Sequence, residues 1–147
     1  MTVDEEFMRA AIEEAKKSVG QMCVGAVIVK DGKIISRAYS TTYTEKNGLR
    51  HDEIKVVDAA IGILGTKHLP DCTLYTTVEP CMMCTGAALW EKVRRIVYGM
   101  KREDSEKYFE YTKHWYSNIG ELLPADCEVI SGILREECKK VFSGNNK

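Results

Sequence analysis

The chain has 147 residues, of which 44% are hydrophobic and 29% charged, and this size and balance suit one domain spanning residues 1–147. The formal net charge of −1 excludes a chain-wide electrostatic bias toward nucleic acid, although it leaves room for a local basic patch. No apolar run is long enough to span a bilayer, and the acidic start lacks the pattern of a signal peptide. We therefore expect a cytoplasmic protein with no membrane partner.

The first part of the chain predicts a helix followed by a β-hairpin. Apolar residues recur at helical spacing over residues 4–18, and Asp4 is the expected N-cap. Two β-rich runs follow at 23–30 and 33–39. The Asp31-Gly32 pair between them is a strong hairpin signal, because a two-residue turn of this type matches the twist of the flanking strands.

The rest of the chain alternates between helical and strand patterns. Gly65 fits a helix C-cap, and Pro80 fits a helix start. The expected elements are a loop at 40–50, a helix at 51–64, a strand at 72–77, a helix at 80–92, a strand at 94–99, a loop or short helix with interleaved aromatic residues at 100–124, a strand at 127–130, a helix at 133–142 and a frayed tail at 143–147. Strands that alternate with helices after a hairpin predict a three-layer α/β/α sandwich.

The six cysteines divide into one close pair and four isolated residues. Cys81 and Cys84 have the spacing of a metal-binding or redox pair. The other four lie among apolar residues and are expected to be small buried thiols: Cys23, Cys72, Cys127 and Cys138. A disulfide framework belongs to secreted chains, so we do not expect one here.

A candidate catalytic metal site combines this pair with His51 and Glu53. One imidazole and two thiols can hold a zinc ion through three protein ligands and leave a fourth position open, which is the pattern of catalytic zinc. His51 and the cysteine pair both lie at expected helix starts that follow strands. Helix N-termini at neighbouring strand ends would bring the three ligands together.

Glu53 is the expected proton-transfer group of this site. It is not needed as a ligand, and from the first helical turn its carboxylate can reach a zinc-bound water. Zinc lowers the pKa of such a water toward ~7, and Glu53 would take the proton. The resulting hydroxide would be a nucleophile for an electrophilic carbon of the substrate.

Other sites also use a C-x-x-C pair. A zinc ribbon needs a second such pair to close its four-ligand site, and the sequence has none. A thioredoxin-like redox role would leave His51 unexplained. The order His, Glu, Pro-Cys, Cys therefore favours catalytic zinc.

These motifs resemble those of the cytidine deaminase-like superfamily, in its branch of cytosine deaminases, guanine deaminases and tRNA adenosine deaminases. Residues 24–32 are similar to the first hairpin of that branch and residues 74–87 to its second zinc segment. Ala88-Leu89-Trp90 looks like the guanine deaminase version of the helix, whereas residues 127–138 look more like the C-terminus of the tRNA enzymes.

The resemblance implies a five-stranded mixed sheet, a homodimer, zinc held by His51, Cys81 and Cys84, and Glu53 as the proton shuttle. An apolar helix face at 87–90 would suit the dimer contact.

Two positions depart from the family's pattern. The family usually has Ala or Gly between the His and the Glu, where this chain has Asp52. Relatives commonly carry a base-binding Asn at the position that counts back to Ser40, and a hydroxyl cannot make the paired contact of an amide. Both departures bear on the substrate more than on the reaction.

The substrate-contact candidates are Gly25, Ala26, Ser40, Asp52, Glu79, Asp104 and His114. Each has a plainer interpretation: Asp52 suits any helix start, and Ser40 any loop. The aromatic residues between 108 and 116 are candidates both for core packing and for stacking on a heterocycle.

The favoured function is a zinc-dependent hydrolytic deaminase of a nucleobase, nucleoside or related small heterocycle, guanine- or cytosine-like. The alternative is a tRNA adenosine-to-inosine deaminase, for which Lys101-Arg102, Arg94-Arg95 and Lys139-Lys140 supply cations, although acidic residues accompany most of them. A third possibility is a zinc module without catalysis, in which Cys23 or Cys72 would be a fourth ligand.

Overall fold

The computed structural model describes residues 1–144. In chain order its elements are α1 (Val3–Ala15), β1 (Gly25–Lys30), β2 (Lys33–Tyr39), α2 (Thr42–Glu45), α3 (Asp52–Leu64), β3 (Cys72–Val78), α4 (Met82–Trp90), β4 (Arg95–Met100), the short 3-10 helix η1 (Arg102–Asp104), α5 (Glu106–Thr112), the 3-10 helix η2 (Ile119–Leu122), β5 (Glu128–Ile130) and α6 (Arg135–Phe142).

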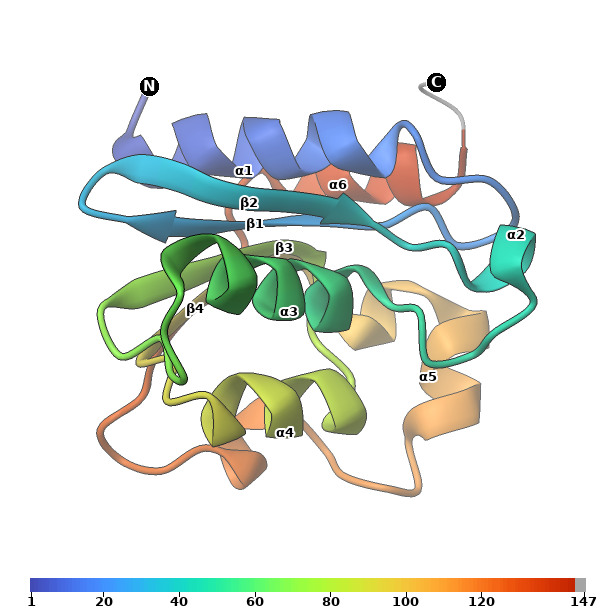
Figure 1. The fold of residues 1–147 in the computed structure, drawn as a ribbon. Helices are drawn as coiled ribbons and strands as arrows, with labels where there is room; N and C mark the ends of the chain where they lie inside the picture. The colour runs from blue at the N-terminus through green and yellow to red at the C-terminus, as the bar shows by residue number, and fades with distance from the viewer. Residues whose placement is uncertain (145–147) are drawn as a thin grey trace.

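These elements form the predicted three-layer sandwich around a five-stranded mixed sheet. The strand order is β2-β1-β3-β4-β5. β1 runs antiparallel to both of its neighbours, whereas β3, β4 and β5 are parallel. Helices α1 and α6 lie together on one face of the sheet, and α3 and α4 lie on the other (Figure 1). The parallel half of the sheet places the carboxyl ends of β3 and β4 at one edge, where α4 and η1 begin.

The predicted hairpin between β1 and β2 is confirmed. Asp31 and Gly32 have φ values of 52° and 73°, the left-handed pair that a tight two-residue hairpin turn requires. The register shifts between Ile28 and Val29, which indicates a bulge.

The predicted start and end of the first helix are wrong. Thr2, not Asp4, is the N-cap: its hydroxyl accepts from the Glu5 backbone N–H, and the Glu5 side chain accepts from the Thr2 N–H. This reciprocal pair satisfies two N–H groups that Asp4 alone could not reach. Asp4 instead accepts hydrogen bonds from Arg95 and Tyr75, and the helix ends at Ala15.

The expected loop at 40–50 contains the short helix α2, so that prediction is wrong in part. The stretch at 100–124, expected to be a loop or a short helix, contains η1, α5 and η2. Helix α4 begins at Met82, after the N-cap Cys81, and not at Pro80, so the expected start is wrong by two residues. The expected frayed tail includes residues 145–147, which lie outside the described part of the chain.

Gly25 allows α1 to lie close against β1. A Cβ at this position would lie 2.4 Å from the backbone N of Ala15, so a larger residue would push the helix away. Apolar residues fill both faces of the sheet, and within residues 1–144 no helix has the length and apolar character needed to cross a membrane.

Candidate metal centre and active site

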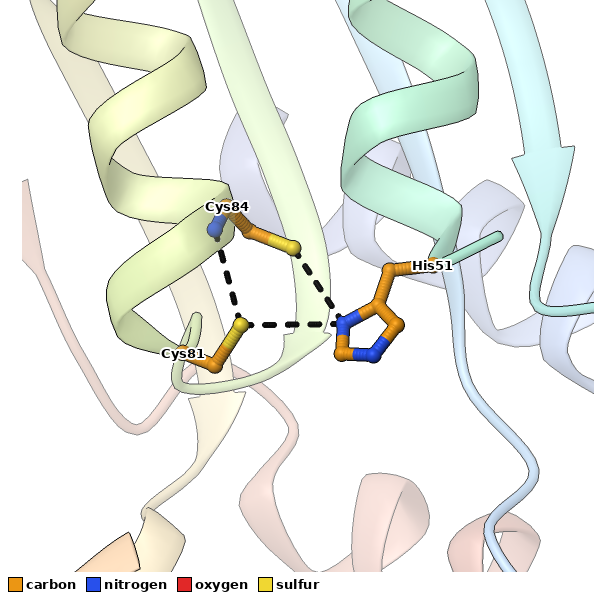
Figure 2. Close-up of side chains that lie close together, drawn as sticks. All are labelled: His51, Cys81 and Cys84. Carbon is orange, nitrogen blue, oxygen red and sulfur yellow. Dashed lines mark hydrogen bonds between the residues drawn. The ribbon is translucent and has the colours of Figure 1, made fainter. Parts of the chain in front are cut away.

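The three expected zinc ligands converge from the first turns of two helices. His51 is the N-cap of α3, and Cys81 is the N-cap of α4, with Cys84 one turn further along. Figure 2 shows the two sulfur atoms facing the imidazole of His51 from the neighbouring helix. Proline at 80 and the strand end at Val78 direct the chain into this turn.

The ligand atoms have the spacing of a tetrahedral zinc site. His51 Nδ1 lies 3.6 Å from Cys81 Sγ and 3.3 Å from Cys84 Sγ, and all three atoms lie within 4.8 Å of one another. Zinc bonds of about 2.3 Å to sulfur and about 2.0 Å to nitrogen place tetrahedral ligands about 3.6 Å apart. The donors therefore fit zinc with little movement.

The three candidate ligands shift one another's pKa values. Hydrogen bonding from Cys84, together with His51, lowers the pKa of Cys81 to about 4, whereas the same contact raises the pKa of Cys84. The hydrogen bond with Cys81 raises the pKa of His51. Hydrogen bonds therefore join the two sulfur atoms to His51 Nδ1. A coordinated metal would take the place of the protons in these bonds, because it deprotonates a thiol.

No further ligand completes the set within the described residues. His51, Cys81 and Cys84 form the single group of three or more ligand-type side chains found there. Cys23 and Cys72, the expected fourth ligands of a non-catalytic zinc module, do not join it. Three ligands leave one coordination position open, which is the catalytic arrangement.

Two buried carboxyl groups lie beside this centre. Asp52 and Glu53 are 1% and 5% exposed, and each has an oxygen 3.2 Å from the hydroxyl of Thr76 on β3. Burial raises the pKa of both, most strongly for Asp52, on which the Glu53 charge also acts. Sequence reasoning missed Thr76, whose signal is a polar residue near the carboxyl end of an otherwise buried strand.

A small cavity of about 70 Å³ adjoins the metal centre. It brings together four residues expected from the sequence to act at the site or on the substrate: Ser40, Asp52, Glu53 and Glu79. The metal ligand His51 also lines it. Its other lining residues are Met22, Val24, Thr42, Val78 and Tyr108.

Glu79 lines the cavity, but both oxygens of its carboxylate accept hydrogen bonds from backbone N–H groups. Its two oxygens accept hydrogen bonds from the N–H groups of Arg102 and Ile119, at 3.1 Å each. Glu79 therefore ties η1 and η2 to the end of β3, and a wholly substrate-facing role is not supported.

Arg102, which the sequence offered as a cation for binding tRNA, is buried in the structure. It is 1% exposed, and its Nη2 donates to the carbonyl oxygens of Tyr116 and Ser117 at 2.6 and 2.8 Å. Its guanidinium also lies 3.9 Å from the Tyr116 ring centroid and 5.6 Å from that of Phe109. A cation this deeply buried cannot contact a nucleic acid.

Four candidates for substrate contact lie elsewhere. The Gly25 N–H donates to Thr77, and Ala26 is fully buried in the core. Asp104 accepts from the Lys101 N–H and forms a two-point ion pair with Arg135 on α6. His114 is exposed and does not line the cavity.

The aromatic residues around α5 divide between packing and the site. Phe109 and Tyr116 pack on Arg102, and the Tyr116 hydroxyl donates to Pro80 O at 2.9 Å. Tyr108, Tyr111 and Trp115 line a largely apolar groove of about 840 Å³, which His51 and Cys81 also line. The groove therefore opens from the metal centre to the surface.

Comparison with known proteins gives the same class as the site. The family model for the cytidine and deoxycytidylate deaminase zinc-binding region matches residues 1–100. A tRNA-specific adenosine deaminase of Bacillus subtilis (strain 168) is 39% identical over 150 aligned positions, which cover 97% of this chain and 88% of that protein.

Solved structures agree with the fold. One, from a study of A-to-I editing by tRNA:A34 deaminases at the wobble position of transfer RNA, is 30% identical with a TM-score of 0.70, covering 92% of this chain and 98% of that one. The guanine deaminase from Bacillus subtilis is 31% identical with a TM-score of 0.68, covering 82% of each chain.

The fold, the three-ligand centre and these likenesses define a zinc-dependent hydrolytic deaminase that acts on C–N bonds. The chain belongs to the cytidine and deoxycytidylate deaminase zinc-binding family.

Proposed function

We propose that this protein deaminates adenosine to inosine in a tRNA. The observation that carries the proposal is the 39% identity to the Bacillus subtilis tRNA-specific adenosine deaminase, which extends over 97% of the chain. That length includes both helix starts of the metal centre and the segment around α5.

The groove beside the metal centre supports a macromolecular substrate. It extends from His51 and Cys81 to the exposed side chains of Met82, Tyr111 and Trp115, which nucleotides flanking the reacting base could contact. Enzymes that act on a base within a polynucleotide take it out of the stack into a pocket, and aromatic side chains suit unstacked bases.

We assign His51, Cys81 and Cys84 as the ligands and Glu53 as the proton carrier. Zinc, when bound there, supplies a water of lowered pKa as the nucleophile. The Glu53 carboxylate would take a proton from that water as its oxygen bonds to C6 of adenine, and would pass the proton to the ring nitrogen. Glu53 would then take the second proton from the new hydroxyl on C6 and give it to the amino group, which leaves as ammonia when the C6–N bond breaks and the C6 carbonyl forms.

The second candidate is the one favoured by sequence reasoning, a free guanine- or cytosine-like heterocycle. The likeness to the Bacillus subtilis guanine deaminase and the net charge of −1 support it. The tRNA-specific adenosine deaminase and the structure from the tRNA:A34 deaminase study, which match 97% and 92% of this chain, favour the tRNA substrate instead, so this interpretation takes second place.

A substrate panel separates the two candidates. Wild-type protein is incubated with tRNA carrying adenosine at the wobble position, and separately with guanine, cytosine, adenine and their nucleosides, while ammonia and inosine are measured. We expect inosine in the tRNA and no ammonia from the free compounds. Ammonia from free guanine or cytosine with no inosine in tRNA would replace this proposal with the second candidate.

The role of Glu53 is tested with Glu53→Gln and the exposed α1 glutamate variant Glu13→Gln as a matched control. We expect the first to lose about 10²- to 10⁴-fold in kcat, the usual contribution of general acid–base catalysis, while keeping one zinc per chain. The control should match the wild type. Full activity in Glu53→Gln would contradict the assignment.

We also propose a cytoplasmic homodimer. The six cysteines are all free thiols, which suits a reducing compartment. Trp90 is 81% exposed on the apolar helix α4, and a large exposed aromatic side chain is typical of an interface. Light scattering should give the mass of a dimer for wild type and of a monomer for Trp90→Glu. A monomeric wild-type protein would contradict the proposal.

A further inference from the structure

Asp52 stands out because it is a carboxylate buried beside the proposed proton carrier. It is the first residue of α3 and is 1% exposed. A buried carboxyl group without a partner is costly, so its hydrogen bonds show what holds it. Its Oδ2 accepts a hydrogen bond from the Thr76 hydroxyl at 3.2 Å, and its side chain also hydrogen bonds with the Glu53 carboxyl group.

Thr76 is a rigid anchor for that contact. It is fully buried in the middle of the sheet, where its backbone pairs with Ala26 on β1 and Tyr98 on β4. A β-branched side chain on a paired strand has few rotamers, so the hydroxyl is fixed relative to the sheet.

The same hydroxyl contacts the carboxylate of Glu53. Thr76 Oγ1 lies 3.2 Å from Glu53 Oε2, the same separation as from Asp52. The two carboxyl groups also contact each other directly, because, in addition to burial, a side-chain hydrogen bond between them shifts the pKa of both. The Thr76 hydroxyl is the donor in both contacts, so its one proton lies between the two carboxyl groups and joins them.

We propose that Asp52 is a positioning residue, which acts through Thr76 to hold the Glu53 carboxylate beside the metal centre. This inference rests on the proposed role of Glu53. A proton-transfer group must be held within about 0.5 Å of its working position, and a partner fixed to the sheet provides that restraint. Asp52 completes the arrangement by fixing the Thr76 hydroxyl from its other side.

The kinetic test uses two pairs of variants, with turnover measured on whichever compound of the panel reacts. Thr76→Val and Asp52→Ala remove the linkage, whereas Thr76→Ser and Asp52→Asn keep a group that can hydrogen bond. We expect the first pair to lose about tenfold to a hundredfold in kcat, the equivalent of one hydrogen bond to a charged group, with KM and zinc content unchanged. The second pair should stay within about threefold of wild type, since the bond is kept.

Two further comparisons make the test specific. Thr73→Val, a half-buried threonine on the same strand, should behave as wild type. The double variant Asp52→Ala/Thr76→Val should be no slower than Thr76→Val, because both changes break one linkage. If the loss in kcat of the double variant equalled the product of the losses of the two single variants, the proposal would be overturned. A kcat for Thr76→Val equal to that of the wild type would also overturn it.

A crystallographic comparison requires no substrate. We expect the Glu53 carboxylate to leave its wild-type position in Thr76→Val and to keep it in Thr76→Ser. An unmoved carboxylate in Thr76→Val would overturn the positioning role. Absence of turnover by the wild type would count against the proposed function alone, so the two failures are distinguishable.

Discussion

Two regions surround the cavity, and they are built in different ways. The candidate metal centre, formed by His51, Cys81 and Cys84, is placed by the starts of two helices. His51 and Cys81 are the N-caps of α3 and α4, and Cys84 lies in the first turn of α4. The aromatic segment, residues 105–118, is held by two buried charged side chains. Arg102 donates to the carbonyl oxygens of Tyr116 and Ser117, and Glu79 accepts from the N–H groups of Arg102 and Ile119, which flank the segment. Helix starts place the ligands, whereas buried charged side chains place the segment opposite them.

Because the two regions are held by different residues, we expect a substitution in one region to leave the other intact. Loss of a ligand removes the chemistry and leaves the sheet, whereas loss of a buried tie loosens the segment and leaves the metal. Variants in each region can therefore be compared by their zinc content and their stability.

Cys84→Ala should abolish both zinc binding and activity. The side chain is fully buried and supplies one of the three donors, and a catalytic metal contributes several kcal/mol to the barrier, so we expect a loss of about 10³-fold or more. Zinc is measured by atomic emission, and turnover on the reacting substrate.

The matched control is Cys127→Ala, a buried thiol outside the ligand group. It should keep one zinc per chain. If Cys84→Ala also kept its zinc, the ligand assignment would be wrong.

Arg102→Met should destabilise the aromatic segment while the metal stays bound. It removes two hydrogen bonds from a buried cation and its packing on Tyr116, although it also relieves the cost of burying a charge. We expect a loss of about 2 kcal/mol in unfolding free energy and a raised KM, with one zinc per chain. Urea unfolding and kinetics give the two values.

The exposed arginine variant Arg94→Met serves as the control and should unfold as wild type. Loss of zinc in Arg102→Met would show that the two regions are coupled more tightly than their separate construction indicates.

Tyr116→Phe should produce a smaller effect of the same kind. Its hydroxyl donates to Pro80 O, the residue before Cys81, and this bond joins the aromatic segment to the metal centre. Loss of one neutral hydrogen bond costs about 1 kcal/mol. Tyr43→Phe, which changes an exposed ring, should cost nothing, and an equal loss in both variants would refute the role of this bond.

Asp104→Asn should change acid stability more than activity. Hydrogen bonding from Arg135 lowers the pKa of Asp104 below its ordinary 3.8. The stabilisation is therefore complete above that value and is lost as the pH falls through the lower pKa of the folded protein.

The difference in Tm between wild type and Asp104→Asn should consequently shrink from about pH 6 to about pH 3. Both proteins have the same metal centre, so acid loss of zinc cancels in the difference. A constant difference in Tm would show that the ion pair does not contribute in this way.

The metal centre could be predicted from the sequence because its residue types are unusual in combination and lie near helix starts. The same reasoning misplaced Asp104 and Arg102. A sequence shows that these residues carry charge, but their partners are Arg135 and the carbonyl oxygens of Tyr116 and Ser117, which only folding brings near. Thr76 was missed for the same reason, since a threonine in a strand gives no sign of two carboxyl neighbours.

Local sequence patterns were sufficient to predict the order of the main helices and strands, the Asp31-Gly32 turn and the candidate zinc ligands. These depend on periodicity, turn chemistry and ligand type, which act over a few residues. The contacts of Asp52 and Glu53 with Thr76 and the burial of Arg102 appear only in the folded chain, because hydrogen-bond partners and exposure depend on strand order and on residues distant in the chain.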